Sequence, residues 1–281
     1  MPPTSRSRST TTHLVGSLFL SEAKVHEQGR DGASRASLQA RNDLGVAHFD
    51  AGRFDAATAV LEPVVEDCTA MLGVGDVDTL VAAGNLGMTY MHLERYEQGL
   101  AMLAENVAFR ERYFGETDPL TMTARHAQGI AFEMAGRLPD ALATLASVAA
   151  QRSRILGPAH TDSLTSRVAL ALARANTGDT VGAVPGLVAA LEDVEHSVGP
   201  RTVPAVTIRI HLADCHTELG QVDDAATALR RAASDCQEVL GPTAPLAAAL
   251  RDEAFALQTA ETGGISGAES LRGSGGGRGT R

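Results

Sequence analysis

The chain has 281 residues, of which 44% are hydrophobic, 21% are charged and only 4% are aromatic, and it contains no tryptophan. A core of Ala, Leu and Val suits closely packed helices better than sheets, which favour β-branched and aromatic residues. The formal net charge of −10 argues against nucleic-acid binding, which needs a basic face. No stretch approaches the ~20 apolar residues of a membrane-spanning helix, so we expect no membrane partner.

The N-terminal residues form two segments. Residues 1–12 are rich in Ser, Thr and Pro, and we expect them to be disordered. Residues 13–35 are expected to form a degenerate capping helix. Their apolar run at 13–20 is too short for a signal peptide and lacks a clear cleavage site. The three cysteines have no metal-like spacing and indicate buried, reduced thiols, so we expect a cytoplasmic protein.

A repeat of 42 residues begins near residue 36. Its first sign is a glycine that directly follows an apolar residue five times in constant register. A glycine after an apolar-periodic run is typical of a helix end. The five positions are Gly73, Gly115, Gly157, Gly199 and Gly241.

A second register within each repeat predicts a pair of helices. It comprises a small residue in the first helix, a turn position seven residues later, a second small residue and then a leucine four residues on. Small side chains let two helices approach closely while leucines fill the space beside them. The pattern therefore predicts a helix A, a tight turn and an antiparallel helix B. The first small residues are Gly45, Gly87, Gly129, Ala171 and Ala213, and the leucines are Leu61, Leu103, Leu145, Leu187 and Leu229.

The clearest copies, LGVAHFDAGRFDAATAVL at 44–61 and LGMTYMHLERYEQGLAML at 86–103, resemble tetratricopeptide repeats. The longer period and the linkers at 118–121 and 160–164 resemble the kinesin-light-chain-like subtype. The resemblance implies an all-α, right-handed superhelix (an α-solenoid) of about five repeats over 36–260, with capping helices. A flexible Gly-rich tail is expected at 261–281. A β-propeller and HEAT or armadillo repeats have similar periods, but the helical periodicity and the small-residue pair disfavour them.

The sequence contains no constellation typical of an enzyme or a metal site. It has no H-E-x-x-H, no phosphate-binding glycine loop and no G-x-S-x-G. His211 and His216 are five residues apart, on different faces of a helix. We therefore expect a protein that is not an enzyme and that has no cofactor and no metal.

The resemblance implies that a partner binds along helix A, on the concave face of the superhelix. Asparagines there resemble those that hold a peptide backbone in similar repeats, and an amide offers both a donor and an acceptor. Phe49 and Met88 would offer adaptable apolar contacts. The candidate groove residues are Gln39, Asn42, Phe49, Asn85, Met88, His92, His126, Glu133 and Asp214.

Arginine recurs at one repeat position, at Arg41, Arg125, Arg167, Arg209 and Arg251. These arginines could form a stripe that binds acidic peptide or phosphate. The interpretation we favour is that each one pairs with a neighbouring acid within the scaffold, because the arginine recurs even in the weaker copies.

These observations favour an adaptor or scaffold that binds a protein or peptide. A regulatory sensor arm that acts in trans on a signalling ATPase or a transcription regulator is the alternative. Self-association also stays open, because repeat architectures carry many unrelated functions.

Overall fold

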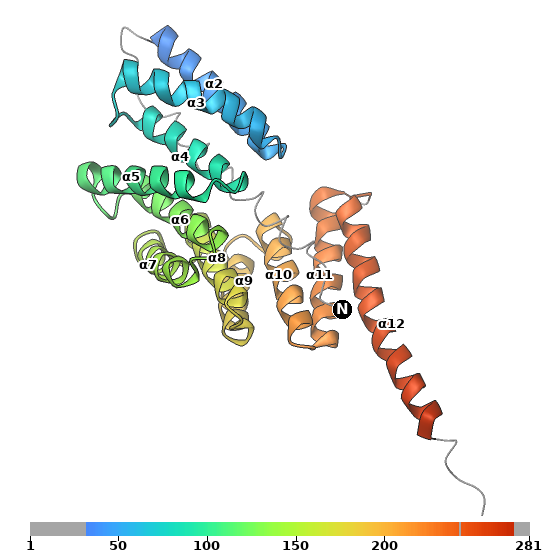
Figure 1. The fold of residues 1–281 in the computed structure, drawn as a ribbon. Coiled ribbons are helices and arrows are strands. Elements are labelled where there is room, and N and C mark those ends of the chain that lie inside the picture. The colour runs from blue at the N-terminus through green and yellow to red at the C-terminus, as the bar shows by residue number, and fades with distance from the viewer. Residues whose placement is uncertain (1–31, 242, 273–281) are drawn as a thin grey trace, which may run out of the picture. The chain divides into compact units, whose positions relative to one another are not determined.

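The computed structural model describes residues 32–241 and 243–272, with side chains described for 35–241 and 243–259. This part of the chain is helical, with no strands, as the repeat pattern predicts (Figure 1). The helices are α2 (Gly32–Asp50), α3 (Phe54–Leu72), α4 (Val77–His92), α5 (Tyr96–Phe114), α6 (Pro119–Met134), α7 (Leu138–Leu156), α8 (Thr161–Asn176), α9 (Thr180–Ser197), α10 (Val203–Glu218), α11 (Val222–Leu240) and α12 (Pro245–Arg272).

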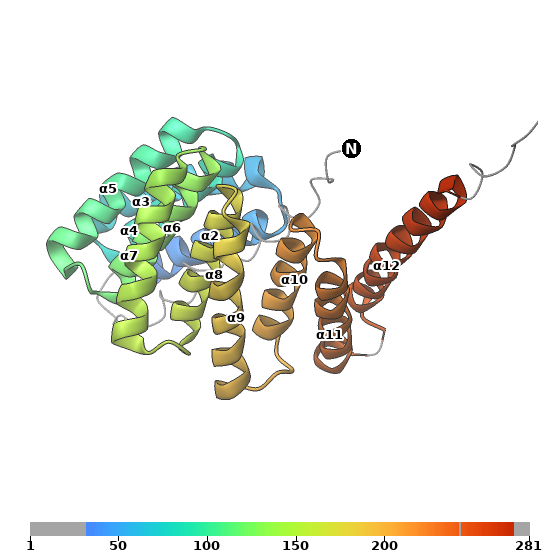
Figure 2. The ribbon, with the colours of Figure 1, turned by 90° about the horizontal axis from the view of Figure 1, so that it is seen from below.

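The helices form two compact units, one ending at Ile155 and one beginning at Leu156. In the first unit α2, α4 and α6 are the A helices. α4 packs against both α2 and α6, and the A helices also pack against the B helices beside them. In the second unit α8 to α12 pack consecutively, and α8 also contacts α10 (Figure 2). Each unit is therefore a stack of antiparallel helix pairs of the predicted type.

The recurring glycines lie one or two residues after the ends of the B helices, which confirms their predicted role. At Gly73, Gly115, Gly157, Gly199 and Gly241 the backbone φ lies between 91° and 98°. At Gly73 and Gly115 the ψ angles are 159° and 161°, a region that residues with a Cβ essentially never occupy. The next A helix then begins at a capping side chain after four of these glycines, at Asp76, Asp118, His160 and Thr202. Asp76 accepts from the backbone N–H of Asp78, and Asp118 accepts from those of Leu120 and Thr121.

The small residues of the A helices lie against the predicted leucines. A Cβ added at Gly45 would lie 2.6 Å from Leu61, and one added at Gly129 would lie 2.8 Å from Leu145. The corresponding distance at Gly87 is 3.0 Å, to Leu103. Both Leu103 and Leu145 are buried. Glycine is therefore the residue that lets helices A and B pack at this distance.

The ends of the repeat domain differ from the expected boundaries. The first A helix begins at Gly32, four residues before position 36. The last helix continues to Arg272, although a flexible tail was expected from 261. Glycine lowers helix stability without blocking the backbone, and no proline interrupts this stretch. The expected N-terminal tail, most of the expected capping helix, and 273–281 lie outside the described residues.

Candidate functional site

The A helices α2 and α4 meet along a seam of six residues. Arg35, Asn42 and Phe49 follow one another at a spacing of seven on α2, and Asp78, Asn85 and His92 do the same on α4. Seven residues are about two helical turns, so each set shares one helix face. The seam pairs each residue of α2 with the residue 43 positions later, through an ion pair, an amide pair and a ring contact.

One end of the seam is charged. The Nε of Arg35 lies 2.6 Å from Oδ2 of Asp78, and its Nη2 lies 2.6 Å from Oδ1 of Asp76. The side-chain amide of Gln39 also donates to the Asp78 carboxylate, at 3.1 Å. The hydrogen bond to Asp78 is the main cause that raises the pKa of the Arg35 guanidinium. Because Asp76 and Asp78 lie at the start of α4, the helix dipole also stabilises their charge.

The middle of the seam is the amide pair formed by Asn42 and Asn85. Asn85 Nδ2 donates to Asn42 Oδ1 at 3.0 Å, and the two residues are 7% and 5% exposed. A side-chain amide carries two N–H donors and one acceptor oxygen. Among the residues that the structure describes, no other hydrogen bond is made by these two side chains. Among these residues, the NH₂ group of Asn42 and the side-chain carbonyl oxygen of Asn85 therefore stay available for hydrogen bonds to a ligand.

The other end of the seam is aromatic. The ring of Phe49 lies 4.9 Å from that of His92, edge to face, and 5.4 Å from that of Phe54 at the start of α3. The rings of Phe54 and His92 stack at 4.6 Å. Phe49 is buried and His92 is half-buried. This cluster joins the turn between α2 and α3 to the C-terminal end of α4.

Two candidate residues of α6 lie in a different environment. His126 is fully buried, and this burial lowers its pKa to about 3, with the positive charge of Arg152 acting in the same direction. The imidazole is therefore neutral near pH 7. Arg152, itself 1% exposed, donates from Nη2 to the hydroxyl of Thr123 at 2.7 Å. Glu133 is half-buried near the end of α6.

The two remaining candidates lie on α4 and α10. Met88 is buried on α4, at 4% exposure. Asp214 belongs to α10 of the second unit, where its carboxylate lies 3.9 Å from Nδ1 of His211. The structure therefore brings together Gln39, Asn42, Phe49, Asn85 and His92. Met88, His126 and Glu133 take no part in the seam contacts described above, and Asp214 belongs to the second unit. The binding roles of all these residues stay predictions.

Family models of the tetratricopeptide repeat match residues 37–78, 78–153 and 206–245, which together cover more than half of the chain. The chain is a tetratricopeptide repeat protein. No match to a curated protein was found.

Several solved structures share this fold. A Podosopora anserina protein of nearly identical TPR-like repeats, named for kinesin light chain, is 20% identical with a TM-score of 0.63, and the match covers 76% of this chain and 99% of that one. BtubC (BKLC) from P. vanneervenii is 16% identical with a TM-score of 0.58, over 81% and 95% of the two chains. TTC0263, a TPR protein of Thermus thermophilus, is 21% identical with a TM-score of 0.54, over 79% and 99%. The repeat register and these structures agree on a solenoid of the kinesin-light-chain-like type.

Four of the five recurring arginines form ion pairs within this tetratricopeptide repeat scaffold, which confirms the structural interpretation for them. Each pairs with an acid at an offset of +26 or −14 along the chain, on a neighbouring B helix. The pairs are Arg41–Asp67 at 2.6 Å, Arg125–Glu111 at 2.6 Å, Arg167–Asp193 at 2.5 Å, Arg209–Glu195 at 2.5 Å and Arg209–Asp235 at 2.7 Å. Arg251 forms no ion pair among the described residues.

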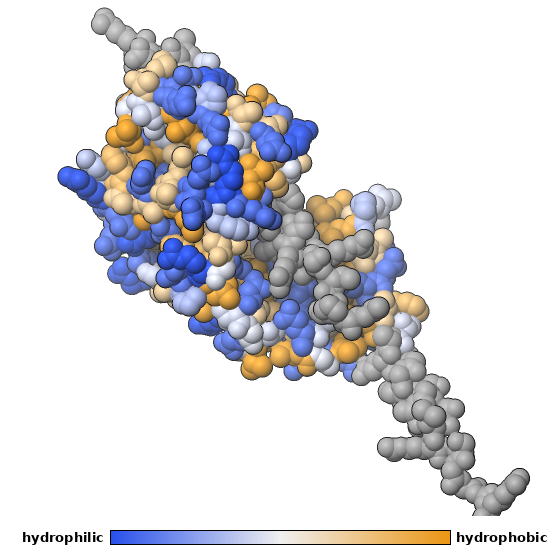
Figure 3. Space-filling view, viewed as in Figure 1, coloured by the Kyte–Doolittle hydropathy of each residue, from blue (hydrophilic) through white to orange (hydrophobic). Residues whose placement is uncertain are grey.

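The described part of this tetratricopeptide repeat protein offers no metal centre, because no three His, Cys, Asp or Glu side chains gather there. No described helix is long and apolar enough to cross a membrane. Cys68, Cys215 and Cys236 are free and buried, as the sequence predicts. On the face seen in Figure 3, apolar residues are scattered among polar ones.

Proposed function

We propose that this protein is an adaptor that binds a protein or peptide partner along the A helices of its first unit. Tetratricopeptide repeats generally serve as scaffolds for protein–protein interaction. The observation that carries the proposal is the amide pair at the centre of the seam. It keeps a donor on Asn42 and an acceptor on Asn85, which are the two groups that an extended peptide backbone requires.

The residues on either side of the pair would add specificity. Toward the N-terminal end of α4, Asp76 and Asp78 offer two carboxylates. Among the described side chains, only Arg35 and Gln39 donate hydrogen bonds to them. Toward the other end, the half-buried ring of His92 continues into the aromatic cluster. A peptide that crosses the seam would therefore meet acidic, amide and aromatic groups in order. Charge complementarity of this kind selects partners more than it strengthens binding.

We also propose that the protein is cytoplasmic, is not an enzyme and uses no cofactor. A regulatory sensor arm would use the same binding step and would differ in passing the bound state to an effector in trans. No feature of the described residues favours the sensor over the adaptor, so the adaptor is the function proposed.

Peptides selected against the immobilised wild-type chain from a displayed library would provide the ligand for a test. The affinity of a selected peptide is then measured by fluorescence anisotropy for wild type and for Asn42→Ala/Asn85→Ala. We expect the double variant to bind at least about tenfold more weakly, since two hydrogen bonds to the peptide are lost.

Gln98→Ala is the matched control, because Gln98 is an exposed amide on α5, away from the seam. Circular dichroism of all variants checks that helix content and melting are preserved. Equal affinity of the double variant and wild type, with the fold intact, would show that the seam is not the binding site.

A further inference from the structure

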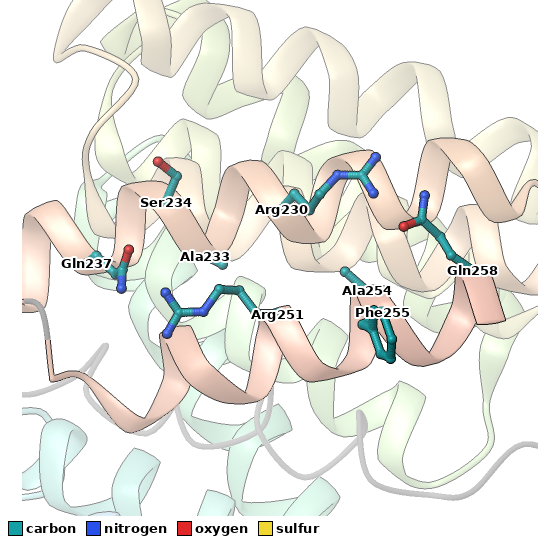
Figure 4. Close-up of a pocket in the computed structure, with 8 residues that line it drawn as sticks. All are labelled: Arg230, Ala233, Ser234, Gln237, Arg251, Ala254, Phe255 and Gln258. Atoms are coloured by element: carbon teal, nitrogen blue, oxygen red, sulfur yellow. The ribbon is translucent and has the colours of Figure 1, made fainter.

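An open pocket of about 290 Å³ lies between α11 and α12 in the second unit. Two arginines line it, Arg230 from α11 and Arg251 from α12 (Figure 4). Figure 4 shows Arg251 opposite Gln237 toward one end, and Arg230 near Gln258 toward the other. Among the described residues, no acidic side chain lines the pocket. On a chain with a net charge of −10, this is a locally cationic site.

Arg251 is the recurring arginine whose acidic partner is missing. The other four members pair with an acid at an offset of −14 or +26 along the chain. For Arg251 these positions hold Gln237 and, outside the described residues, Gly277. The scaffold function of this arginine is therefore lost in the last copy, although the arginine itself is retained.

Other acids near this end of α11 are already engaged. Asp235 lies 2.7 Å from Nη1 of Arg209, and Glu238 lies 2.8 Å from Nη1 of Arg201. Arg230 donates to the hydroxyl of Thr227, at 3.0 Å, and forms no ion pair among the described residues. Within that part of the chain, both guanidinium groups of the pocket thus lack a carboxylate.

Two further residues of this pocket differ from their counterparts in the earlier copies. Phe255 occupies the position that is Gly45, Gly87, Gly129, Ala171 and Ala213 in the earlier copies, and it is 69% exposed. Arg230 occupies a position that is Glu62, Ala104, Ala146 and Val188 elsewhere. Packing against a following B helix would require a small residue at 255, and Phe255 instead lines the pocket with an exposed ring. The missing acid at position 237, the large residue at 255 and the arginine at 230 therefore meet at one pocket.

We propose that the α11–α12 pocket binds an acidic peptide segment of a partner protein. A carboxylate at each end would accept hydrogen bonds from Arg251 and Arg230, and the exposed ring of Phe255 would contact an apolar side chain of the same segment. Ala233 and Ala254, both buried, form the floor between the two ends. This site belongs to the second unit and is independent of the seam in the first.

The dimensions favour a peptide over a compact small molecule. Arg230 and Gln237 are seven residues apart on α11, as are Arg251 and Gln258 on α12, which separates the two ends by roughly 10 Å at 1.5 Å per residue. A peptide in the extended polyproline II conformation rises about 3.1 Å per residue with three residues per turn, so acidic residues three positions apart would share one face and span the pocket. The volume is near the lower limit of small-molecule pockets, which usually begin at about 300 Å³.

The test uses the full chain and a fluorescein-labelled peptide that contains the sequence Glu-Ala-Leu-Glu. Anisotropy titration compares it with the same peptide carrying Gln in place of both Glu residues. We expect Arg230→Gln and Arg251→Gln each to weaken binding of the acidic peptide by about tenfold, because each removes a charge-assisted hydrogen bond. We expect Gln237→Glu to weaken binding to a similar extent, since it restores the acid that pairs with this arginine in the earlier repeats.

Arg231→Gln is the matched control, because Arg231 is an exposed neighbour on α11 that does not line the pocket. It removes the same charge and should leave the affinity unchanged. If Arg231→Gln lost as much affinity for the acidic peptide, the binding would be non-specific electrostatic attraction and the proposal would be overturned. Equal affinity for the acidic and neutral peptides would also overturn it. Displacement of the bound peptide by citrate at the peptide's own concentration would also overturn it, in favour of a small-anion site. Binding that survives Asn42→Ala/Asn85→Ala separates this pocket from the seam.

Discussion

Glu94 occupies the turn position that is glycine in the other repeats. Its φ is 59°, close to the values of 69° at Gly52 and 70° at Gly220. The left-handed region costs a residue with a Cβ about 1–2 kcal/mol, whereas glycine enters it without this steric cost. Glu94 is exposed, so no buried contact offsets the strain.

We therefore predict that Glu94→Gly increases the free energy of unfolding by about 1 kcal/mol, measured by urea denaturation. The gain is at the lower end of the steric cost because glycine also makes the unfolded chain more flexible. Gly136→Glu, at the same position of the next repeat, should have the opposite effect. A decrease in stability for Glu94→Gly would mean that the glutamate makes a stabilising interaction that outweighs its backbone strain.

Helix pairs within the repeats depend on glycine for a different reason, which is space. At Gly129 on α6 an added Cβ would lie 2.8 Å from the side chain of buried Leu145 on α7. At Gly186 on α9 an added Cβ would meet only the Cβ of Ala171, at 3.6 Å, an ordinary contact distance. Helix propensity alone favours alanine over glycine equally at both sites, by about 1 kcal/mol.

The pair of substitutions separates these two effects. We predict that Gly186→Ala raises the melting temperature, and that Gly129→Ala lowers the stability by about 1–3 kcal/mol, as overpacked cores do. Thermal unfolding followed by circular dichroism provides both values. If Gly129→Ala also stabilised the protein, close packing of helices A and B would not be the reason for glycine there.

The same elements show what the sequence could and could not predict. Gly73 and its counterparts were identified from one residue type at one spacing, because a backbone φ of 93° depends on the glycine itself. The amide pair was not foreseen, because Asn42 and Asn85 do not share a repeat position. Their contact follows from an offset of 43 between adjacent A helices, which only the packed structure reveals.

The sequence carries a signal for the α11–α12 pocket. Arg251 continues the recurring position, but Gln237 replaces the acid that Glu111 and Glu195 provide in other copies. Only the ion pairs in the structure show which acids pair with these arginines. The sequence also does not show how deeply a side chain is buried. His126 was predicted to be a groove residue from its position, and it is fully buried.

On the scale of the whole molecule, stability in a repeat protein is approximately a sum of terms between neighbouring helices. Leu229 on α11 is 2% exposed and packs in a cluster with residues of α10, α11 and α12. Leu103 on α5 is equally buried, at 1%, in the first unit. Replacing either leucine with alanine should cost about 2–5 kcal/mol locally.

We predict that Leu229→Ala decreases the hydrogen-exchange protection of α10, α11 and α12 while leaving α2, α3 and α4 close to wild type. Leu103→Ala should give the reverse pattern, with the loss centred on α4, α5 and α6, because α5 contacts α4 and α6. Exchange followed by mass spectrometry of the full chain measures both. Uniform loss of protection along the chain in either variant would show that the protein unfolds as one cooperative body, in which case nearest-neighbour packing would not describe its stability.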